Sequence, residues 1–135
     1  MGSTAERLRK NGIHPSAQRV AVGDYVLATD AHPSAEQVWV EVRARLPVIS
    51  RATVYNTLNL FVRKGLLRQI QLADGKIGFD PNLEPHHHFI DEATGVVHDV
   101  PWDALEVRRV EALRGVEVRE YQVVLRGRSG RTRAG

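Results

Sequence analysis

Histidine is the residue type in this chain with the clearest capacity for chemistry. There are six histidines, and three are consecutive at positions 86, 87 and 88. Side chains alternate along a β-strand, so His86 and His88 share one face while His87 points away, and Asp99 on the next strand can lie opposite them. A His-x-His pair is more often a hydrogen-bonded or surface pair than a ligand set, so this segment alone leaves both interpretations open.

Two further residues make the metal interpretation stronger. His32 stands in a loop before Pro33, and Asp80 stands just before a short linker, so three imidazoles and two carboxylates can converge where two structural units join. The predicted ligands are His32, Asp80, His86, His88 and Asp99. Five nitrogen and oxygen ligands favour Fe(II) or Mn(II), with Zn(II) as a competing substitute.

A second group of polar residues has the chemistry of DNA recognition. The segment 51–64 has an apolar stripe of Val54, Leu58 and Phe61 at helical spacing. Its remaining face carries residue types that pair with bases and phosphates, namely Arg51, Tyr55, Asn56, Asn59 and Arg63. The alternative is a polar helix face that is simply solvated.

The elements that position these residues follow from caps and periodicity. We predict helices at about 4–11, at 17–28, after Ser34 and ending before Pro47, and at 51–64 after Ser50. Strands at 66–72 and 76–80 form a hairpin around Asp74-Gly75. Helices followed by a hairpin predict a winged-helix DNA-binding domain over residues 1–80.

A linker and a smaller unit complete the chain. Two prolines predict a hinge at 81–85, followed by strands at 86–91 and 96–100, a helix at about 102–114 and a strand at 116–126. The unit 86–127 is too small to bury a large core alone, so we expect it to dimerise. The Arg-rich segment 128–135 is predicted to be a flexible tail. The predicted fold class is therefore α+β, with a winged-helix domain hinged to a small α/β dimerisation domain.

Composition excludes several classes of protein. The 135 residues include no cysteine, which excludes disulfides, thiolate zinc sites and thiol catalysis. Residues 1–80 carry eleven Lys or Arg and seven Asp or Glu, whereas residues 81–125 carry four and nine. The basic half suits a polyanion and the acidic segment suits a cation, although scattered surface charge is the alternative. Lacking a long apolar run or signal peptide, the chain is expected to be cytoplasmic with no membrane partner.

Several segments together resemble the ferric uptake regulator (Fur) family, and within it the peroxide-responsive PerR-like branch. They extend over roughly residues 5–127 with family-like spacing. The matching segments are Gln18-Arg19, Ala31-His32-Pro33-Ser34-Ala35, Ser50 to Leu58, Gly65-Leu66, Phe79-Asp80, His86 to Ile90 and Val97-His98-Asp99.

The resemblance implies a homodimeric, metal-dependent repressor of double-stranded operator DNA. The family's regulatory ligands fall on the five residues predicted above, and an aspartate at 99 favours the peroxide-responsive branch. In that branch bound Fe(II) reacts with hydrogen peroxide and oxidises ligand histidines, here His32 and His86, whereas the Mn(II) form stays an insensitive repressor. The resemblance also implies that Arg19 contacts DNA, and it places His14 where a basic residue often enters the minor groove.

Two departures from the family pattern stand out. The four cysteines of its structural zinc site are replaced by Asp91, Thr94, Ser129 and Thr132, so no such zinc is expected. A further regulatory site maps onto Pro85, His87, Glu106 and Tyr121, of which only His87 and Glu106 can ligate, and we expect that site to be empty.

Three alternatives remain for the function. A repressor of the same family can sense iron, manganese or zinc availability without peroxide chemistry. The chain can also be a DNA-binding module that has lost its metal site. A small metalloenzyme is the third possibility, but no dedicated general base or substrate loop supports it, so we predict that the chain is not an enzyme.

Overall fold

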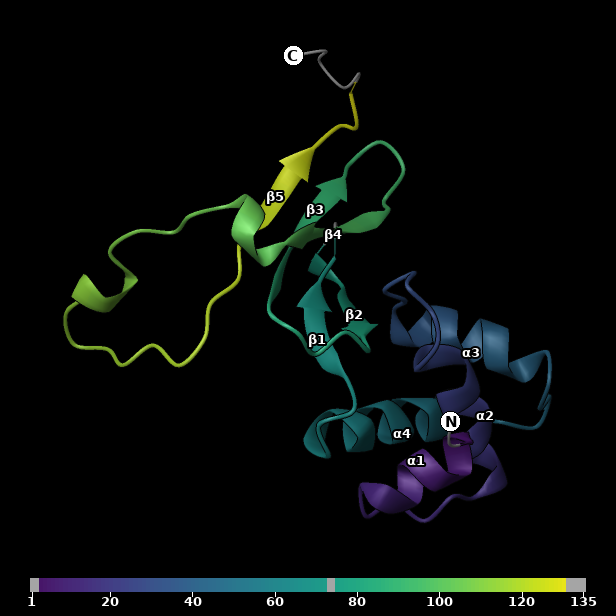
Figure 1. Ribbon diagram of the computed structural model, residues 1–135. Helices are drawn as coiled ribbons and strands as arrows, with labels where there is room; N and C mark the ends of the chain where they lie inside the picture. Colours follow the sequence, from purple (N-terminus) through teal and green to yellow (C-terminus); the bar gives the residue numbers. More distant parts are fainter. Residues whose placement is uncertain (1–2, 73–74, 131–135) are drawn as a thin grey trace. The chain divides into compact units, whose positions relative to one another are not determined.

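The computed structural model describes residues 3–72 and 75–130, and the chain divides into two compact units, residues 1–83 and 84–135. Four helices and a hairpin make the first unit (Figure 1): α1 (Thr4–Lys10), α2 (Ala17–Val26), α3 (Ala35–Arg43), α4 (Arg51–Arg63), β1 (Arg68–Gln71) and β2 (Ile77–Asp80). Each helix begins after a serine whose hydroxyl accepts a backbone N–H, and Ser34 forms a full capping box with Gln37.

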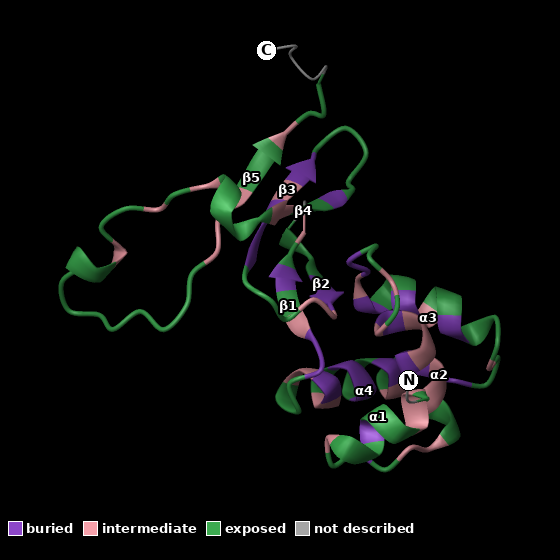
Figure 2. Cartoon of the chain, in the orientation of Figure 1, coloured by how far each residue is buried: buried purple, intermediate pink, exposed green. Residues whose placement is uncertain are grey.

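The core of the first unit lies between its helices. Figure 2 shows the buried residues on the inner sides of α2, α3 and α4, where Val26, Val38, Leu58 and Phe61 are fully buried. The hairpin pairs β1 with β2 antiparallel, from Arg68 opposite Asp80 to Gln71 opposite Ile77. The four predicted helices and the two strands are confirmed, whereas Asp74 of the predicted turn lies outside the described residues.

The second unit contains a three-stranded sheet in the order β4-β3-β5, drawn in Figure 1. Strand β3 (His86–Asp91) pairs antiparallel with β4 (Val97–Pro101) and parallel with β5 (Val124–Gly127). Among the described residues of this unit, Ile90 and Val97 are the buried apolar side chains. The unit therefore has a small core of its own.

The helix predicted at 102–114 is wrong. The segment holds two short 3-10 turns, Trp102–Ala104 and Val110–Ala112, and Arg109 between them has a left-handed backbone with φ of +67°. A short helix needs an apolar face buried by tertiary packing, yet Leu113 is 58% exposed. The β-branched Val107 and Val110 further lower the helix propensity.

The strand predicted at 116–126 is also shorter than expected. Only Val124–Gly127 pairs with β3, and Val116 and Val118 are exposed in irregular backbone. The parallel pairing begins at His88 opposite Val124, where the backbone N–H of His88 donates to Val123 O at 3.1 Å. Of the predicted tail 128–135, residues 131–135 lie outside the described part of the chain.

None of the helices in the described residues is long and apolar enough to cross a membrane.

Candidate metal centre and nucleic-acid interface

The first unit brings two of the predicted ligands together. His32 Nε2 lies 3.4 Å from Asp80 Oδ2, and both side chains are buried. The other carboxylate oxygen of Asp80 accepts the backbone N–H of Asn82 at 2.9 Å. This hydrogen bond fixes the carboxylate so that its second oxygen faces the imidazole, which is how outer partners commonly orient a metal ligand.

The loop that carries His32 is held against β2 by backbone contacts. Phe79 N–H donates to Pro33 O at 2.9 Å, and Ser34 forms an isolated bridge with Gly78. A Cβ at position 78 would lie 2.7 Å from the carbonyl oxygen of His32, so only glycine permits this approach. His32 itself has a left-handed backbone with φ of +52°, a conformation that costs a non-glycine residue about 1 kcal/mol. The packing of the loop therefore holds His32 beside Asp80.

Replacing Gly78 with alanine tests this packing. We expect Gly78→Ala to lower the free energy of unfolding by about 1–3 kcal/mol, because the added methyl meets backbone that must move. Metal affinity should fall as well, since His32 would shift away from Asp80. Calorimetry of unfolding and Mn(II) titration measure the two effects. Gly130→Ala, which adds a methyl with nothing within 4 Å, is the control, and equal behaviour of the two variants would contradict this account.

The second unit brings together the other three predicted ligands. His88 is the β-partner of Asp99, as predicted, and His86 lies on the same face of β3. His86 Nε2 is 3.1 Å from His88 Nε2, and Asp99 Oδ1 is 3.6 Å and 3.3 Å from these two nitrogens. Three donor atoms thus converge within one small triangle.

The spacing of these atoms fits a bound metal ion. Ligands at about 2.1 Å from a metal lie about 3.0 Å apart in octahedral geometry and about 3.4 Å apart in tetrahedral geometry. His86 Nδ1 contacts the carbonyl oxygen of Glu84, which can only accept, so Nδ1 carries the proton and Nε2 keeps its lone pair. Two imidazoles and one carboxylate on one side of an ion are the donor set typical of non-haem Fe(II).

His87 points to the other face of β3 and has a different environment. Its Nδ1 accepts the backbone N–H of Val123 at 2.9 Å, and its ring stacks on Trp102 with centroids 4.6 Å apart. Tyr121 lies near the same stack. Glu106, the other candidate for a further metal site, is exposed beside Arg108 at 3.9 Å. His87 therefore anchors β3 from behind and uses one ring nitrogen for a backbone hydrogen bond.

The positions at which the resemblance expects zinc-binding cysteines hold a hydrogen-bonded cluster instead. The pKa of Asp91 is lowered, chiefly by a hydrogen bond from the Ser129 hydroxyl and further by the backbone N–H groups of Ala93 and Thr94. Ala93 N–H donates to Asp91 Oδ1 at 2.9 Å. One carboxylate thus connects the end of β3, its turn and the segment after β5. Thr132 lies outside the described residues.

A lowered pKa makes this cluster sensitive to acid. The ionised Asp91 carboxylate is bound more tightly in the folded state, so its contribution is complete above its ordinary pKa of 3.8 and is lost as pH falls through the lower folded value. We therefore expect the free energy of unfolding, measured with urea, to fall more between pH 5 and pH 3 for the wild type than for Asp91→Asn. Parallel pH profiles for the two proteins would contradict the role of the charge.

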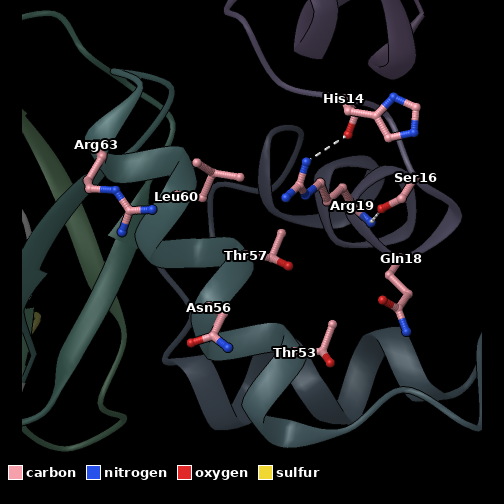
Figure 3. Close-up of a pocket in the computed structure, with 9 residues that line it drawn as sticks. All are labelled: His14, Ser16, Gln18, Arg19, Thr53, Asn56, Thr57, Leu60 and Arg63. Atoms are coloured by element: carbon pink, nitrogen blue, oxygen red, sulfur yellow. Dashed lines mark hydrogen bonds between the residues drawn. The ribbon is translucent and has the colours of Figure 1, made fainter.

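Four of the seven predicted DNA-binding residues border a polar groove between the start of α2 and the side of α4 (Figure 3). The groove has a volume of about 440 Å³. Its lining includes four predicted contacts, namely His14, Arg19, Asn56 and Arg63, together with Ser16, Gln18, Thr53, Thr57 and Leu60. Arg19 donates a side-chain hydrogen bond to His14 O at 3.1 Å, as the dashed line in Figure 3 shows, so its guanidinium is fixed at the groove.

The other three predicted contacts lie on α4 outside the groove. Tyr55 is 46% exposed and Asn59 is exposed, whereas Arg51 pairs with Glu36 at 3.0 Å and lies over the ring of Trp39. Sequence reasoning did not identify Gln18 or Thr53 as groove residues. Gln18 lies in the first turn of α2, two residues after the N-cap Ser16. The predicted cap therefore could have placed Gln18 beside Arg19 at the start of the helix.

Comparison with known proteins gives one consistent result. The model of the ferric uptake regulator family matches residues 10–126. The chain is 31% identical over 124 residues to the peroxide operon regulator of Bacillus subtilis, covering 90% of this chain and 86% of that protein. It is 32% identical over 99 residues to the peroxide-responsive repressor PerR of Staphylococcus epidermidis, covering 73% of this chain and 66% of that repressor.

Solved structures agree with the fold. The ferric uptake regulator of Vibrio cholerae superposes with a TM-score of 0.74 at 25% identity, covering 93% of this chain and 98% of that one. The Pseudomonas aeruginosa ferric uptake regulator with manganese superposes with a TM-score of 0.71 at 27% identity, covering 97% of this chain and 100% of that one. The winged-helix and α+β predictions are thereby confirmed. The chain belongs to the ferric uptake regulator family, whose members are transcriptional regulators rather than enzymes.

Proposed function

We propose that this chain is a homodimeric repressor that binds operator DNA when Fe(II) or Mn(II) occupies its histidine and aspartate ligands. The observation that carries the proposal is the convergence of His86 Nε2, His88 Nε2 and Asp99 Oδ1 within 3.1–3.6 Å of one another. Buried imidazoles so close together require either a shared proton or a shared cation. A divalent ion satisfies all three at once.

One ion joins both groups of ligands in this proposal. His32 and Asp80 supply two donors from the DNA-binding unit, and the other three donors come from the second unit. An ion that needs all five ligands favours one arrangement of the two units, so occupancy is coupled to DNA affinity. The solved Pseudomonas aeruginosa ferric uptake regulator contains manganese, which supports Mn(II) as one of the ions for this chain.

The DNA-binding part of the proposal is supported by the charge on the helices. The first turns of α1 and α3 contain Glu6 and Glu36, whereas those of α2 and α4 contain no acidic residue. The same two acid-free helices border the polar groove with Arg19 and Arg63. The N-terminus of a helix and an arginine side chain both attract the negatively charged phosphates of DNA. We infer that α4 and the start of α2 face the operator.

Dimerisation is supported by the apolar surface of the second unit. Leu113 and Val116 are 58% and 61% exposed, and Leu125 on β5 is 38% exposed. A unit of this size with so small a core needs additional apolar burial, which a second copy provides. Two copies present two α4 helices, and the operator should accordingly have two half-sites.

Peroxide is the proposed signal, since the relatives named above are peroxide regulators. Fe(II) held by these ligands would supply the electrons that reduce hydrogen peroxide beside the imidazoles. In the net change, one oxygen atom of peroxide would pass to a ring carbon of His32 or His86 and the other would leave as water. The oxidised imidazole would no longer complete the ligand set, and DNA would be released. Sensing of metal availability without this chemistry is the second candidate.

A single series of experiments separates these candidates. The purified protein is loaded anaerobically with Fe(II) or Mn(II), bound to operator DNA selected from a random pool, and treated with peroxide. We expect release and one added oxygen on a histidine peptide by mass spectrometry only with Fe(II). Release on chelation without oxidation supports metal sensing, and equal DNA binding with and without metal overturns the proposal.

A further inference from the structure

Trp39 on α3 is the centre of a charged cluster that the groove does not include. The guanidinium carbons of Arg43 and Arg51 lie 4.3 Å and 4.2 Å from the centroid of its ring. The indole N–H donates to the carbonyl oxygen of Ile49 at 3.1 Å, so the ring is fixed by the loop between α3 and α4. One fixed aromatic ring therefore contacts two cations, one at the end of α3 and one at the start of α4.

The anion that balances this cluster is weakly held. Glu36 accepts from Arg51 at 3.0 Å, but the two side chains are 49% and 59% exposed. Exposed ion pairs of this kind are weak and are screened by salt. Within the part of the chain that the structure describes, no carboxylate pairs with Arg43. A phosphate, which accepts bidentate hydrogen bonds from guanidinium groups, competes well against a single exposed carboxylate.

The position of the cluster matches the proposed DNA surface. Arg51 is the first residue of α4, and Tyr55 follows one turn later on the same side of the helix, 46% exposed. A phosphate bound at Arg51 would thus lie next to the bases that α4 contacts.

We propose that Trp39 positions Arg43 and Arg51 as a clamp for one DNA phosphate, and that Glu36 occupies the clamp until DNA displaces it. This inference rests on the proposed DNA-binding function. Trp39 acts here as a positioning residue, because it orders both guanidinium groups before DNA arrives. Glu36 acts as an internal competitor, and its charge lowers the affinity of the free protein for DNA.

The test measures DNA affinity of the Mn(II)-loaded full chain as a function of salt concentration. The probes are the selected operator duplex and a random-sequence duplex of the same length. We expect Arg43→Gln and Arg51→Gln to weaken binding about three- to tenfold on both probes, and to reduce the slope of log affinity against log salt by about one. Glu36→Gln should strengthen binding several-fold on both.

Arg45→Gln is the matched control. Arg45 lies two residues after Arg43 but pairs with Asp24 at 3.3 Å. Its loss should leave the salt slope close to that of the wild type. Trp39→Leu keeps both arginines but should weaken DNA binding as much as the loss of one of them. If the arginines acted through their charge alone, this substitution would leave DNA binding unchanged.

A spectroscopic measurement protects the test against variants that fail to fold. The chain has two tryptophans, so Trp39 is the only reporter in a Trp102→Phe background. Addition of DNA should change its emission as Glu36 and the guanidinium groups rearrange, and the change should be absent in Arg43→Gln/Arg51→Gln. If the wild type binds DNA and the clamp variants keep its affinity, salt slope and emission change, the clamp is overturned and the proposed function is not. A wild type that binds no DNA with metal overturns the proposed function and the clamp together.

Discussion

Replacing His88 with alanine should abolish metal-dependent binding of operator DNA. His88 Nε2 lies 3.1 Å from His86 Nε2 and 3.3 Å from Asp99 Oδ1, so its removal opens the centre of the ligand triangle. Loss of a partner outside the ligand shell lowers metal affinity by about 10- to 100-fold, so loss of this ligand should exceed about 100-fold. Mn(II) titration followed by a DNA-binding assay at fixed metal measures both effects.

His98→Ala is the matched control for that experiment. His98 is exposed on β4 next to Asp99, but it pairs with Phe89 and belongs to the other face of the sheet. The control protein should bind Mn(II) and DNA like the wild type. If His88→Ala binds Mn(II) within a few-fold of the wild type, the five-ligand centre does not exist as proposed.

The second large effect is expected for Asn56→Ala on sequence-specific DNA binding. Asn56 lines the groove on α4, is exposed, and belongs to the residue type that pairs bidentately with adenine. Loss of such a contact lowers specific affinity by about 1–3 kcal/mol. Binding to a random-sequence duplex should change little, because phosphate contacts remain.

Asn59→Ala gives an internal comparison on the same helix. Asn59 is exposed but lies outside the groove, so its effect should be smaller than that of Asn56. Fluorescence anisotropy with the selected duplex and with single base-pair variants of it measures the loss at each position. An Asn56→Ala protein that weakens specific and random binding equally would show that Asn56 positions the backbone and does not read a base.

Much of the first unit could be predicted from sequence, because local signals agree there. Ser16, Ser34 and Ser50 cap their helices in the structure as the patterns indicated, and the apolar stripe of α4 is the face that is buried. The β3–β4 register could be predicted for the same reason, since the turn Glu92 to Gly95 fixes which residues lie opposite one another.

In the second unit, the predictions were wrong where burial determines whether a segment forms a helix or a strand. Residues 102–123 have helical or strand-like apolar spacing but few buried contacts within the chain, and a pattern does not reveal whether a partner covers it. The contacts made by Gly78, His87 and Trp39 could not be predicted from the sequence either. Each depends on a contact with a segment distant in the chain, namely the His32 loop, Val123 and Arg51.

The division of the proposed ligands between two units determines how sharply the protein can respond to metal. Only residues 81–85 separate Asp80 from His86, a connection that spans about 20 Å when fully extended. In the proposed five-ligand centre, an ion held by His86, His88 and Asp99 would meet His32 and Asp80 at an effective concentration in the millimolar range. Under this proposal the second group of ligands would bind the ion in an intramolecular step. The metal concentration at which the proposed repression begins would then depend on the length of residues 81–85 as well as on the donors.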